Sequence, residues 1–402
     1  MLLNRDRAEK LMAENDLLAL VASSPANVFY STDCSPYGDS LAVIPLERGT
    51  EPLMVTSIAG TTPVALMSPP WFRDVRYYGE FYIEAPQTMD GLTPEERAVA
   101  EAKRQWEQSK PRDSSQLLIG ALMERGLTEG RIGIDESNLR CSHPLWGMIK
   151  KRLPSVVPVP AQALFKEIRM IKTKTEISRI KTATRITEKA WEASLDSIHR
   201  GITEREFADL WQITIIREGG QSNSYLGAFW PPVAFGRRTA FSDIAQPSKY
   251  RLQPGDIIRF DGGATYMGYP CDMARVAAYM EAGDKLKKYW HAIHAGEQKA
   301  VQMAQPGEDT AKIFNAAVDT VRREGIVHYR RHHTGHGWGI EGYDPPIVGP
   351  KGVKLMQDMV LCFETPYYEV GWGGILHEDV VAVKHGGPQL LSSPEDTLRV
   401  VG

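Results

Sequence analysis

The stretch DIIRFDGGATYMGYPCD, residues 256–272, places two carboxylates on either side of a glycine turn. The apolar run before Asp261 predicts a strand, Gly262 and Gly263 permit a turn, and a returning strand would carry Asp272. The two acidic side chains then lie close together, where like charges repel each other in a partly dry site. A positive group is expected between them, although an Asp pair at this spacing is also typical of a surface turn.

A histidine in a glycine-rich frame lies further along the chain. The segment TGHGWG, residues 334–339, surrounds His336 with three glycines, which let the backbone approach a site closely. An isolated histidine is more often a hydrogen-bonded core or surface residue than a ligand. The glycine frame makes the ligand interpretation about as plausible as the structural one.

Two glutamates interrupt apolar, strand-like segments near the C-terminus. Glu364 follows the run 359–363, and Glu378 lies within 375–381. A buried carboxylate is costly unless it is paired or binds a metal, although each of these acids alone also fits a structural salt bridge. Taken together, four carboxylates and one imidazole form a set of hard ligands suited to two divalent ions, namely manganese, cobalt, iron or zinc. The predicted ligands are Asp261, Asp272, His336, Glu364 and Glu378.

The length and the pattern of the chain predict two domains and an α+β fold class. With 402 residues the chain exceeds the size that one core usually serves, and a proline-rich segment at 153–160 precedes the expected boundary. We expect an α/β domain at 1–165 and a catalytic domain at 166–402. Helices are predicted at 5–15, 174–197, 204–218, 285–303 and 311–324, strands at 17–22, 41–45, 52–56, 132–134 and 256–275, and a turn at 24–25.

The composition limits the partners and the compartment. The formal net charge is −3, so no basic field for nucleic acid or anionic lipid is expected. No apolar run reaches the roughly 18 residues of a membrane span, and charges in residues 4–7 argue against an export signal. The four cysteines are scattered without a CxxC spacing, which is typical of reduced thiols in a cytoplasmic protein.

The ordered ligand set resembles the creatinase/prolidase/methionine-aminopeptidase family. The likeness rests on Asp, Asp, His, Glu and Glu in this order, with Gly335-His336-Gly337 and Glu364-Thr365-Pro366. The segments 4–5, 27–30 and 169–172 are also similar to the N-terminal domain and linker of prolidase-type members. The resemblance implies a pita-bread catalytic domain with a smaller creatinase-type α/β N-terminal domain. It also implies a homodimer, in which the N-terminal domain of one subunit covers the active site of the other.

Roles for individual residues follow from the resemblance. Asp261 would bind one ion, Asp272 and Glu378 would bridge two, and His336 with Glu364 would complete the second. A metal-activated hydroxide would attack the scissile carbonyl carbon, and Glu364 as general base would pass the proton of the water to the leaving amine as the carbon–nitrogen bond breaks. His332 would steady the tetrahedral intermediate, and Arg275 would pair with an acid behind the ligands.

Two positions depart from the peptidases of this family. Ser242 and Tyr343 stand where those peptidases carry histidines, so the substrate remains open between a short peptide and a small molecule. Trp230, Trp338 and Tyr343, with Ser242, are candidates for the pocket wall, and core packing is the alternative for these aromatic side chains.

Three functions are therefore considered. The first is Xaa-Pro peptidase-like hydrolysis of a peptide or amide bond. The second is creatinase-like or ectoine-hydrolase-like cleavage of an amidine or cyclic substrate, and the third is a non-enzymatic binding protein. The complete ligand set argues against the third, because degenerate relatives usually lose metal ligands.

Overall fold

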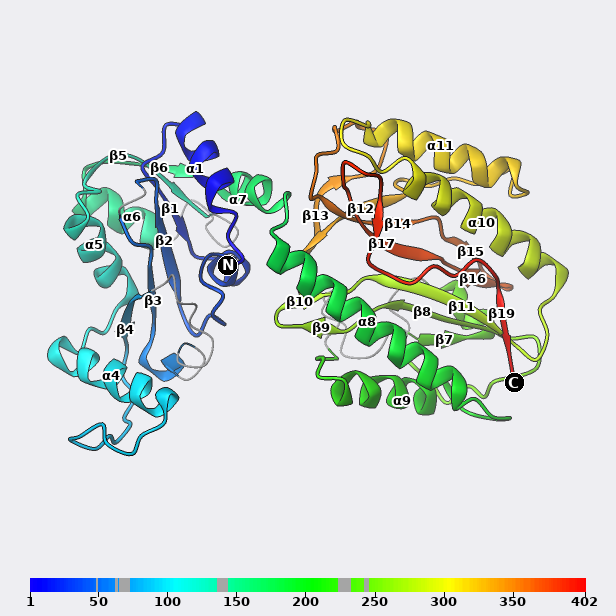
Figure 1. Cartoon of the computed structure of the whole chain (residues 1–402), viewed down its shortest axis with the longest axis horizontal. Coiled ribbons are helices and arrows are strands. Elements are labelled where there is room, and N and C mark those ends of the chain that lie inside the picture. Colours follow the sequence, from blue (N-terminus) through cyan, green and yellow to red (C-terminus); the bar gives the residue numbers. More distant parts are fainter. Residues whose placement is uncertain (48–49, 62–63, 65–72, 136–143, 223–232, 242–245) are drawn as a thin grey trace. The chain divides into compact units, whose positions relative to one another are not determined.

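The computed structural model describes residues 1–47, 50–61, 64, 73–135, 144–222, 233–241 and 246–402. Contacts between Cα atoms divide the chain into two compact units, Met1–Arg169 and Met170–Gly402. Each unit has its own sheet and its own helices (Figure 1).

The first unit contains a six-stranded mixed sheet in the order β4-β3-β2-β1-β5-β6. Parallel pairs join β1 to β5, β5 to β6 and β3 to β4, and the other pairs are antiparallel. This arrangement confirms the predicted α/β layer. The strands are β1 (Ala19–Ala22), β2 (Leu41–Pro45), β3 (Leu53–Ser57), β4 (Asp74–Tyr78), β5 (Glu129–Ile134) and β6 (Ser155–Pro160). The helices are α1 (Arg5–Glu14), α2 (Pro25–Thr32), α4 (Pro94–Ser109), α5 (Ser114–Glu124), α6 (Pro144–Arg152), α7 (Gln162–Arg169) and the short 3₁₀ helix η1 (Ile58–Gly60).

Two segments of this unit differ from the sequence prediction. Residues 24–25, expected to form a turn, begin α2 instead: the Ser24 side chain caps the Asn27 N–H, and Pro25 occupies the first turn. The proline-rich segment 153–160 contains the strand β6, which lies at the edge of the sheet. Proline is tolerated there because an edge strand leaves N–H positions unpaired.

The described residues of the second unit form four long helices and a nine-stranded sheet. Capping boxes at Thr173 and Thr203 begin α8 and α9. The helices are α8 (Lys174–Asp196), α9 (Glu204–Arg217), α10 (Asp284–Gln302), α11 (Thr310–Arg323) and the 3₁₀ helix η2 (Gly236–Ala240). The strands are β7 (Val233–Phe235), β8 (Ile257–Gly262), β9 (Thr265–Tyr266), β10 (Tyr269–Pro270), β11 (Met273–Tyr279), β12 (Gly335–Gly339), β13 (Gly342–Ile347), β14 (Val360–Glu364), β15 (Tyr367–Glu369), β16 (Gly373–Ile375), β17 (Glu378–Ala382), β18 (Gln389–Leu390) and β19 (Arg399–Val401). The predicted helices and the strand pair at 256–275 are confirmed.

The order of the large sheet is β13-β12-β14-β17-β11-β8-β7, with β18 added to β17 and β19 to β11. Figure 1 shows α8 beside α9 and α10 beside α11. Trp191 of α8 packs against Phe260 of β8, with their ring centroids 4.8 Å apart. Phe363 of β14 belongs to the core cluster that α10 and α11 form with the sheet.

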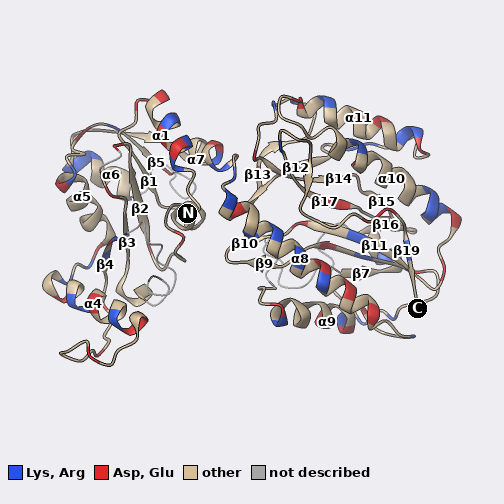
Figure 2. Ribbon diagram, in the orientation of Figure 1, with Lys and Arg blue, Asp and Glu red and all other residues tan. Residues whose placement is uncertain are grey.

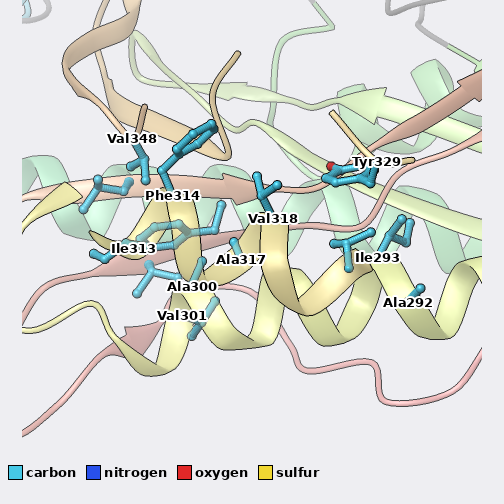
Figure 3. Close-up of a cluster of buried hydrophobic side chains, with 14 of the residues drawn as sticks. Ala292, Ile293, Ala300, Val301, Ile313, Phe314, Ala317, Val318, Tyr329 and Val348 are labelled. Atoms are coloured by element: carbon cyan, nitrogen blue, oxygen red, sulfur yellow. The ribbon is translucent and has the colours of Figure 1, made fainter. Parts of the chain in front are cut away.

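The core between α10, α11 and the sheet is apolar and closely packed (Figure 3). Ile293 and Ala300 of α10 and Ile313 and Ala317 of α11 are fully buried. Burying each large aliphatic side chain contributes about 1.5–3 kcal/mol, so this layer holds one side of the sheet firmly. That rigidity matters because the neighbouring residues of the same strands carry the candidate ligands.

Basic and acidic residues are interspersed along α8, as the blue and red stretches of its ribbon show in Figure 2. This mixture agrees with the small net charge of the chain. Among the described residues, no helix combines the length and apolar character needed to cross a membrane.

Candidate metal centre

Four strands bring three of the predicted ligands into one row across the sheet. Glu364 of β14 pairs with Glu378 of β17, Glu378 pairs with Ala274 of β11, and Ala274 pairs with Asp261 of β8. Directly paired residues of neighbouring strands point to the same face. Asp272 precedes Ala274 by two residues, which places it near the same face.

Side-chain distances show how closely the predicted ligands approach each other. Carboxylate oxygens of Asp261, Asp272 and Glu378 lie within 4.8 Å of one another. The Nε2 atom of His336 lies 3.7 Å from Asp272 Oδ2 and 3.7 Å from Glu378 Oε1. Glu364, the direct partner of Glu378 in the ladder, completes the group. The structure thus gathers all five predicted ligands.

Glycines allow β12 to lie against both of its neighbours. A Cβ atom at Gly335, where φ is +152°, would collide with the carbonyl oxygen of Cys362 on β14. A Cβ atom at Gly337 would collide with the backbone of Asp344 and Pro345 on β13. The glycine frame noted in the sequence is therefore required by close backbone approach on both sides of His336.

The electrostatics of the cluster call for a cation. Burial, followed by the charges of Asp272, Glu364 and Asp261, raises the pKa of Glu378 well above its usual value. Its Oε1 atom is buried and has no hydrogen-bond partner among the described residues. Burial also lowers the pKa of His336 to about 3, so its imidazole is neutral, which is the form that binds metals. These donors fit divalent ions, which remove the like-charge repulsion.

One buried cysteine lies next to these ligands. Cys362, Asp272 and His336 offer donor atoms within 4.8 Å of one another. The thiol donates a hydrogen bond to the carbonyl oxygen of Asp272 at 3.4 Å. Burial and the nearby charges raise the pKa of Cys362 well above its usual value, so the neutral thiol is a poor metal ligand.

The carboxylate of Glu364 contacts two basic side chains. Its Oε2 atom accepts a hydrogen bond from Arg331 at 3.3 Å, and its Oε1 atom lies 3.2 Å from Nδ1 of His333. His332, the predicted catalytic histidine, is exposed, and its ring stands edge-on against His333 at 4.2 Å. The sequence prediction gave no role to Arg331 or His333. The two adjacent histidines carry the same local signal, so the sequence does not show which of them lies against Glu364.

Arg275 lies behind the ligands and is almost completely buried. Its guanidinium pairs with Asp379 Oδ1 at 2.5 Å and with Glu395 Oε2 at 3.4 Å, and it donates to the carbonyl oxygen of Glu378 at 2.7 Å. Burial alone would lower the pKa of Arg275, but the charges of Asp379 and Glu395 outweigh it and raise this pKa. The guanidinium thus anchors the backbone of Glu378 through its carbonyl oxygen.

The predicted pocket residues occupy different environments. The Tyr343 ring stacks on His336, with centroids 3.7 Å apart, and the residue is 43% exposed. Trp338 is fully buried and donates from Nε1 to Pro270 at 2.6 Å, which favours core packing. Asp344, which follows Tyr343, is buried in an ion pair with Lys172 at 3.8 Å. The predicted pocket residues Trp230 and Ser242 lie outside the described residues.

A family model and curated relatives match the part of the chain that carries this cluster. The model described as metallopeptidase family M24 matches residues 178–385. An Xaa-Pro dipeptidase of Pyrococcus furiosus is 28% identical over 236 residues, which cover 58% of this chain and 66% of the relative. An Xaa-Pro dipeptidase of Lactobacillus helveticus is 26% identical over 241 residues, which cover 60% of this chain and 64% of the relative. The chain spans slightly less than two thirds of these relatives' own lengths.

Solved structures resemble nearly the whole chain. An X-Pro aminopeptidase from Thermotoga maritima superposes with a TM-score of 0.77 at 23% identity and covers 99% of both chains. A prolidase from Pyrococcus furiosus superposes with a TM-score of 0.71 at 23% identity, covering 96% of this chain and 99% of the other. At this level of identity the likeness concerns the fold, and it confirms the predicted pita-bread architecture with an additional N-terminal α/β domain.

Proposed function

Because the chain belongs to metallopeptidase family M24, we propose that it is a metal-dependent hydrolase that cleaves Xaa-Pro peptide bonds. The single observation that supports this most strongly is the convergence of Asp261, Asp272, His336, Glu364 and Glu378 on one face of the large sheet. The matched relatives named Xaa-Pro dipeptidase support the substrate class. They do not favour cleavage of an amidine or cyclic substrate.

The five ligands would hold two divalent ions. Carboxylate oxygens of Asp261, Asp272 and Glu378 lie within 4.8 Å of one another, and Asp272 and Glu378 would contribute to holding both ions. Asp261 would complete one site, and His336 with Glu364 the other. Such ions lower the pKa of a coordinated water and polarise the scissile carbonyl.

The protein's own groups would position the substrate and move protons. Glu364 is the candidate general base; its Oε2 atom accepts a hydrogen bond from Arg331, and its Oε1 atom lies 3.2 Å from Nδ1 of His333. The neutral side chain of His333 lies where it can hydrogen-bond either Glu364 or a nearby oxyanion. His332 carries the role implied by family resemblance, so the two histidines are competing candidates for the catalytic imidazole.

Tyr343 is the best-supported candidate for binding substrate. Its ring covers His336 while almost half of the residue remains exposed, so it offers an aromatic wall beside the ligands. A proline ring packs favourably on such a wall. Trp230, Trp338 and Ser242 remain candidates from the sequence pattern alone.

A homodimer in the cytoplasm is part of the same proposal. The described cysteines Cys34, Cys271 and Cys362 are all buried free thiols, which suits a reducing compartment. The family resemblance supports pairing of two chains. Light scattering coupled to size exclusion measures the mass directly, and a monomeric mass at micromolar concentration would contradict the dimer.

The function is tested by assaying Ala-Pro hydrolysis by the full chain before and after chelation, with manganese, cobalt, iron and zinc added back separately. Ala-Ala, creatine and ectoine serve as comparison substrates, and Asp272→Asn is the matched inactive variant. We expect cleavage of Ala-Pro that chelation and Asp272→Asn both abolish. Cleavage that survives both changes, or turnover of creatine or ectoine in preference to Ala-Pro, would contradict the proposal.

A further inference from the structure

A second group of potential ligands lies on the opposite face of the sheet from the five-residue cluster. His377 directly precedes Glu378, and neighbouring residues in an extended segment point to opposite faces. His294 and Glu297 lie three residues apart on α10, on the same side of that helix. Donor atoms of His294, Glu297 and His377 all lie within 4.8 Å of one another.

These donor atoms are buried and lack hydrogen-bond partners. Glu297 and His377 are both fully buried. Within the described part of the chain, Glu297 Oε1, His294 Nε2 and His377 Nδ1 have no hydrogen-bond partner. Buried polar atoms in native proteins almost always have a hydrogen-bond partner or a bound ion. Three such atoms close together without a hydrogen bond therefore indicate a site for a further bound group.

The charges around this group favour a cation as that partner. Three carboxylates, those of Asp379, Glu395 and Glu297, act on the single guanidinium of Arg275. Asp379 and Glu395 already pair with it, whereas Glu297 Oε2 accepts a hydrogen bond from Gln298 at 3.0 Å. Burial first, and then the charge of Asp379, raises the pKa of Glu297 well above its usual value. A bound cation would keep this carboxylate ionised.

The surroundings orient both imidazoles. Trp290 stacks on His294 with ring centroids 4.8 Å apart and planes at 8°. His377 stands edge-on to His294 at 4.9 Å, and its Nε2 lies 3.6 Å from Asp379 Oδ2. A carboxylate near one ring nitrogen is common around metal-binding histidines, and Asp379 lies in such a position beside His377.

We propose that His294, Glu297 and His377 bind one zinc ion, separate from the five-residue centre, which ties α10 to the start of β17. Two imidazoles and one carboxylate are an established ligand set for zinc, with water in the fourth position. The ion would fix the segment that leads into Glu378 from the rear of the sheet. This site is independent of the proposed hydrolase activity.

The test measures the zinc content of the chain and does not depend on catalytic activity. The full chain is stripped with chelator, saturated with zinc, passed over a desalting column and analysed by mass spectrometry for zinc per chain. We expect three equivalents in the parent, two in Glu297→Gln and in His294→Asn, and three in the control His291→Asn, whose exposed imidazole lies on the same helix. In Asp272→Asn we expect at least one equivalent to remain, and the double variant Asp272→Asn, Glu297→Gln to lose that equivalent.

Cobalt gives a second readout. Stripped Asp272→Asn loaded with one equivalent of Co²⁺ should show the intense visible bands of a four-coordinate ion, and Glu297→Gln should remove them. Two findings would overturn the proposal: a parent chain whose zinc content equals that of both Glu297→Gln and His294→Asn, or an Asp272→Asn variant whose cobalt spectrum is unchanged by Glu297→Gln. Failure of the five-residue centre instead would appear as a parent and an Asp272→Asn variant with the same metal content.

Discussion

Glu364 and Glu378 are directly paired residues of β14 and β17, so two carboxylates of the candidate centre lie opposite each other on neighbouring strands. This pairing is unfavourable without a cation, because like charges directly opposite each other destabilise a sheet. Metal binding should therefore stabilise this strand pair, and the strand pair in turn brings the two ligands together.

Glu378→Gln is expected to separate stability from function. In the presence of chelator, the variant no longer holds a carboxyl group whose ionisation is opposed by burial and by the neighbouring acids, so the free energy of unfolding should rise by on the order of 1–3 kcal/mol. With metal present, kcat/KM for Ala-Pro should fall at least about 100-fold, equivalent to ~2.7 kcal/mol of transition-state stabilisation. Urea titrations and initial rates measure the two effects, with the exposed Glu281→Gln as control. A less stable chelated variant would contradict this account of repulsion.

The adjacent histidines can be distinguished by their contacts. His333→Asn should lower kcat/KM about 10–100-fold, because it removes a polar contact with the candidate general base, at 3.2 Å from Nδ1 to Glu364 Oε1, that would be worth ~1.5–3 kcal/mol in the transition state. His332→Asn, at an exposed position, should change kcat/KM by less than about threefold, a difference of under ~1 kcal/mol. Steady-state kinetics of both variants provides the comparison. The reverse ranking would assign the catalytic imidazole to His332.

Tyr343 is predicted to act through its ring. Tyr343→Phe keeps the stacking on His336 and should retain KM within about twofold of the parent. Tyr343→Ala removes the ring and should raise KM for Ala-Pro about 3–10-fold, as loss of an aromatic contact of ~0.5–1.5 kcal/mol implies. Equal KM values for the alanine and phenylalanine variants would show that the ring does not contact the substrate.

Arg275 is expected to matter chiefly for stability. Arg275→Met leaves the buried carboxylate of Asp379 without its ion pair. The free energy of unfolding should therefore fall by about 3–5 kcal/mol. Arg399→Met breaks a partly exposed pair with Glu192 and should cost less than about 1 kcal/mol. Urea denaturation of the two variants under identical metal conditions is the measurement. Similar losses in both would mean that burial does not strengthen the Arg275 pair.

The pH dependence of stability should include a contribution from Glu176 in α8. Burial raises the pKa of Glu176 from 4.5 to about 7, and Tyr269 and Thr173 hydrogen-bond its carboxylate. Between these pH values the folded chain keeps a proton that the unfolded chain has lost. The free energy of unfolding therefore falls as the pH rises through this window, by about 3 kcal/mol at most, and the contribution is constant above it.

Glu176→Gln tests this contribution, because glutamine cannot ionise. Urea titrations at several pH values should show that the free energy of unfolding of the variant falls less steeply than that of the parent between pH 4.5 and about 7. The control is Glu206→Gln, which changes the equivalent capping-box residue of α9 at an exposed position. This control should not flatten the decline. An identical slope in the parent and in Glu176→Gln would contradict the raised pKa.

Much of the fold follows from local sequence patterns. The amphipathic pattern predicts α8 and α9 to within a residue or two, and the capping boxes that the structure shows at Thr173 and Thr203 explain where both helices begin. The same kind of reasoning was wrong at Ser24, where a cap and a turn have similar signatures. It also did not predict the edge strand β6, since prolines normally argue against a strand and only the sheet order shows which strand is at the edge.

The sequence by itself determined the chemical identity and order of the candidate ligands, because Asp261, Asp272, His336, Glu364 and Glu378 each carry a local signal of a polar group within an apolar or glycine-rich segment. Only the tertiary structure decided which side chains meet. Strand register pairs Glu364 with Glu378, backbone orientation directs His333 towards Glu364, and packing of α10 brings His294 and Glu297 to His377. These encounters join residues far apart in the chain, and their geometry depends on pairing and burial that no local pattern specifies.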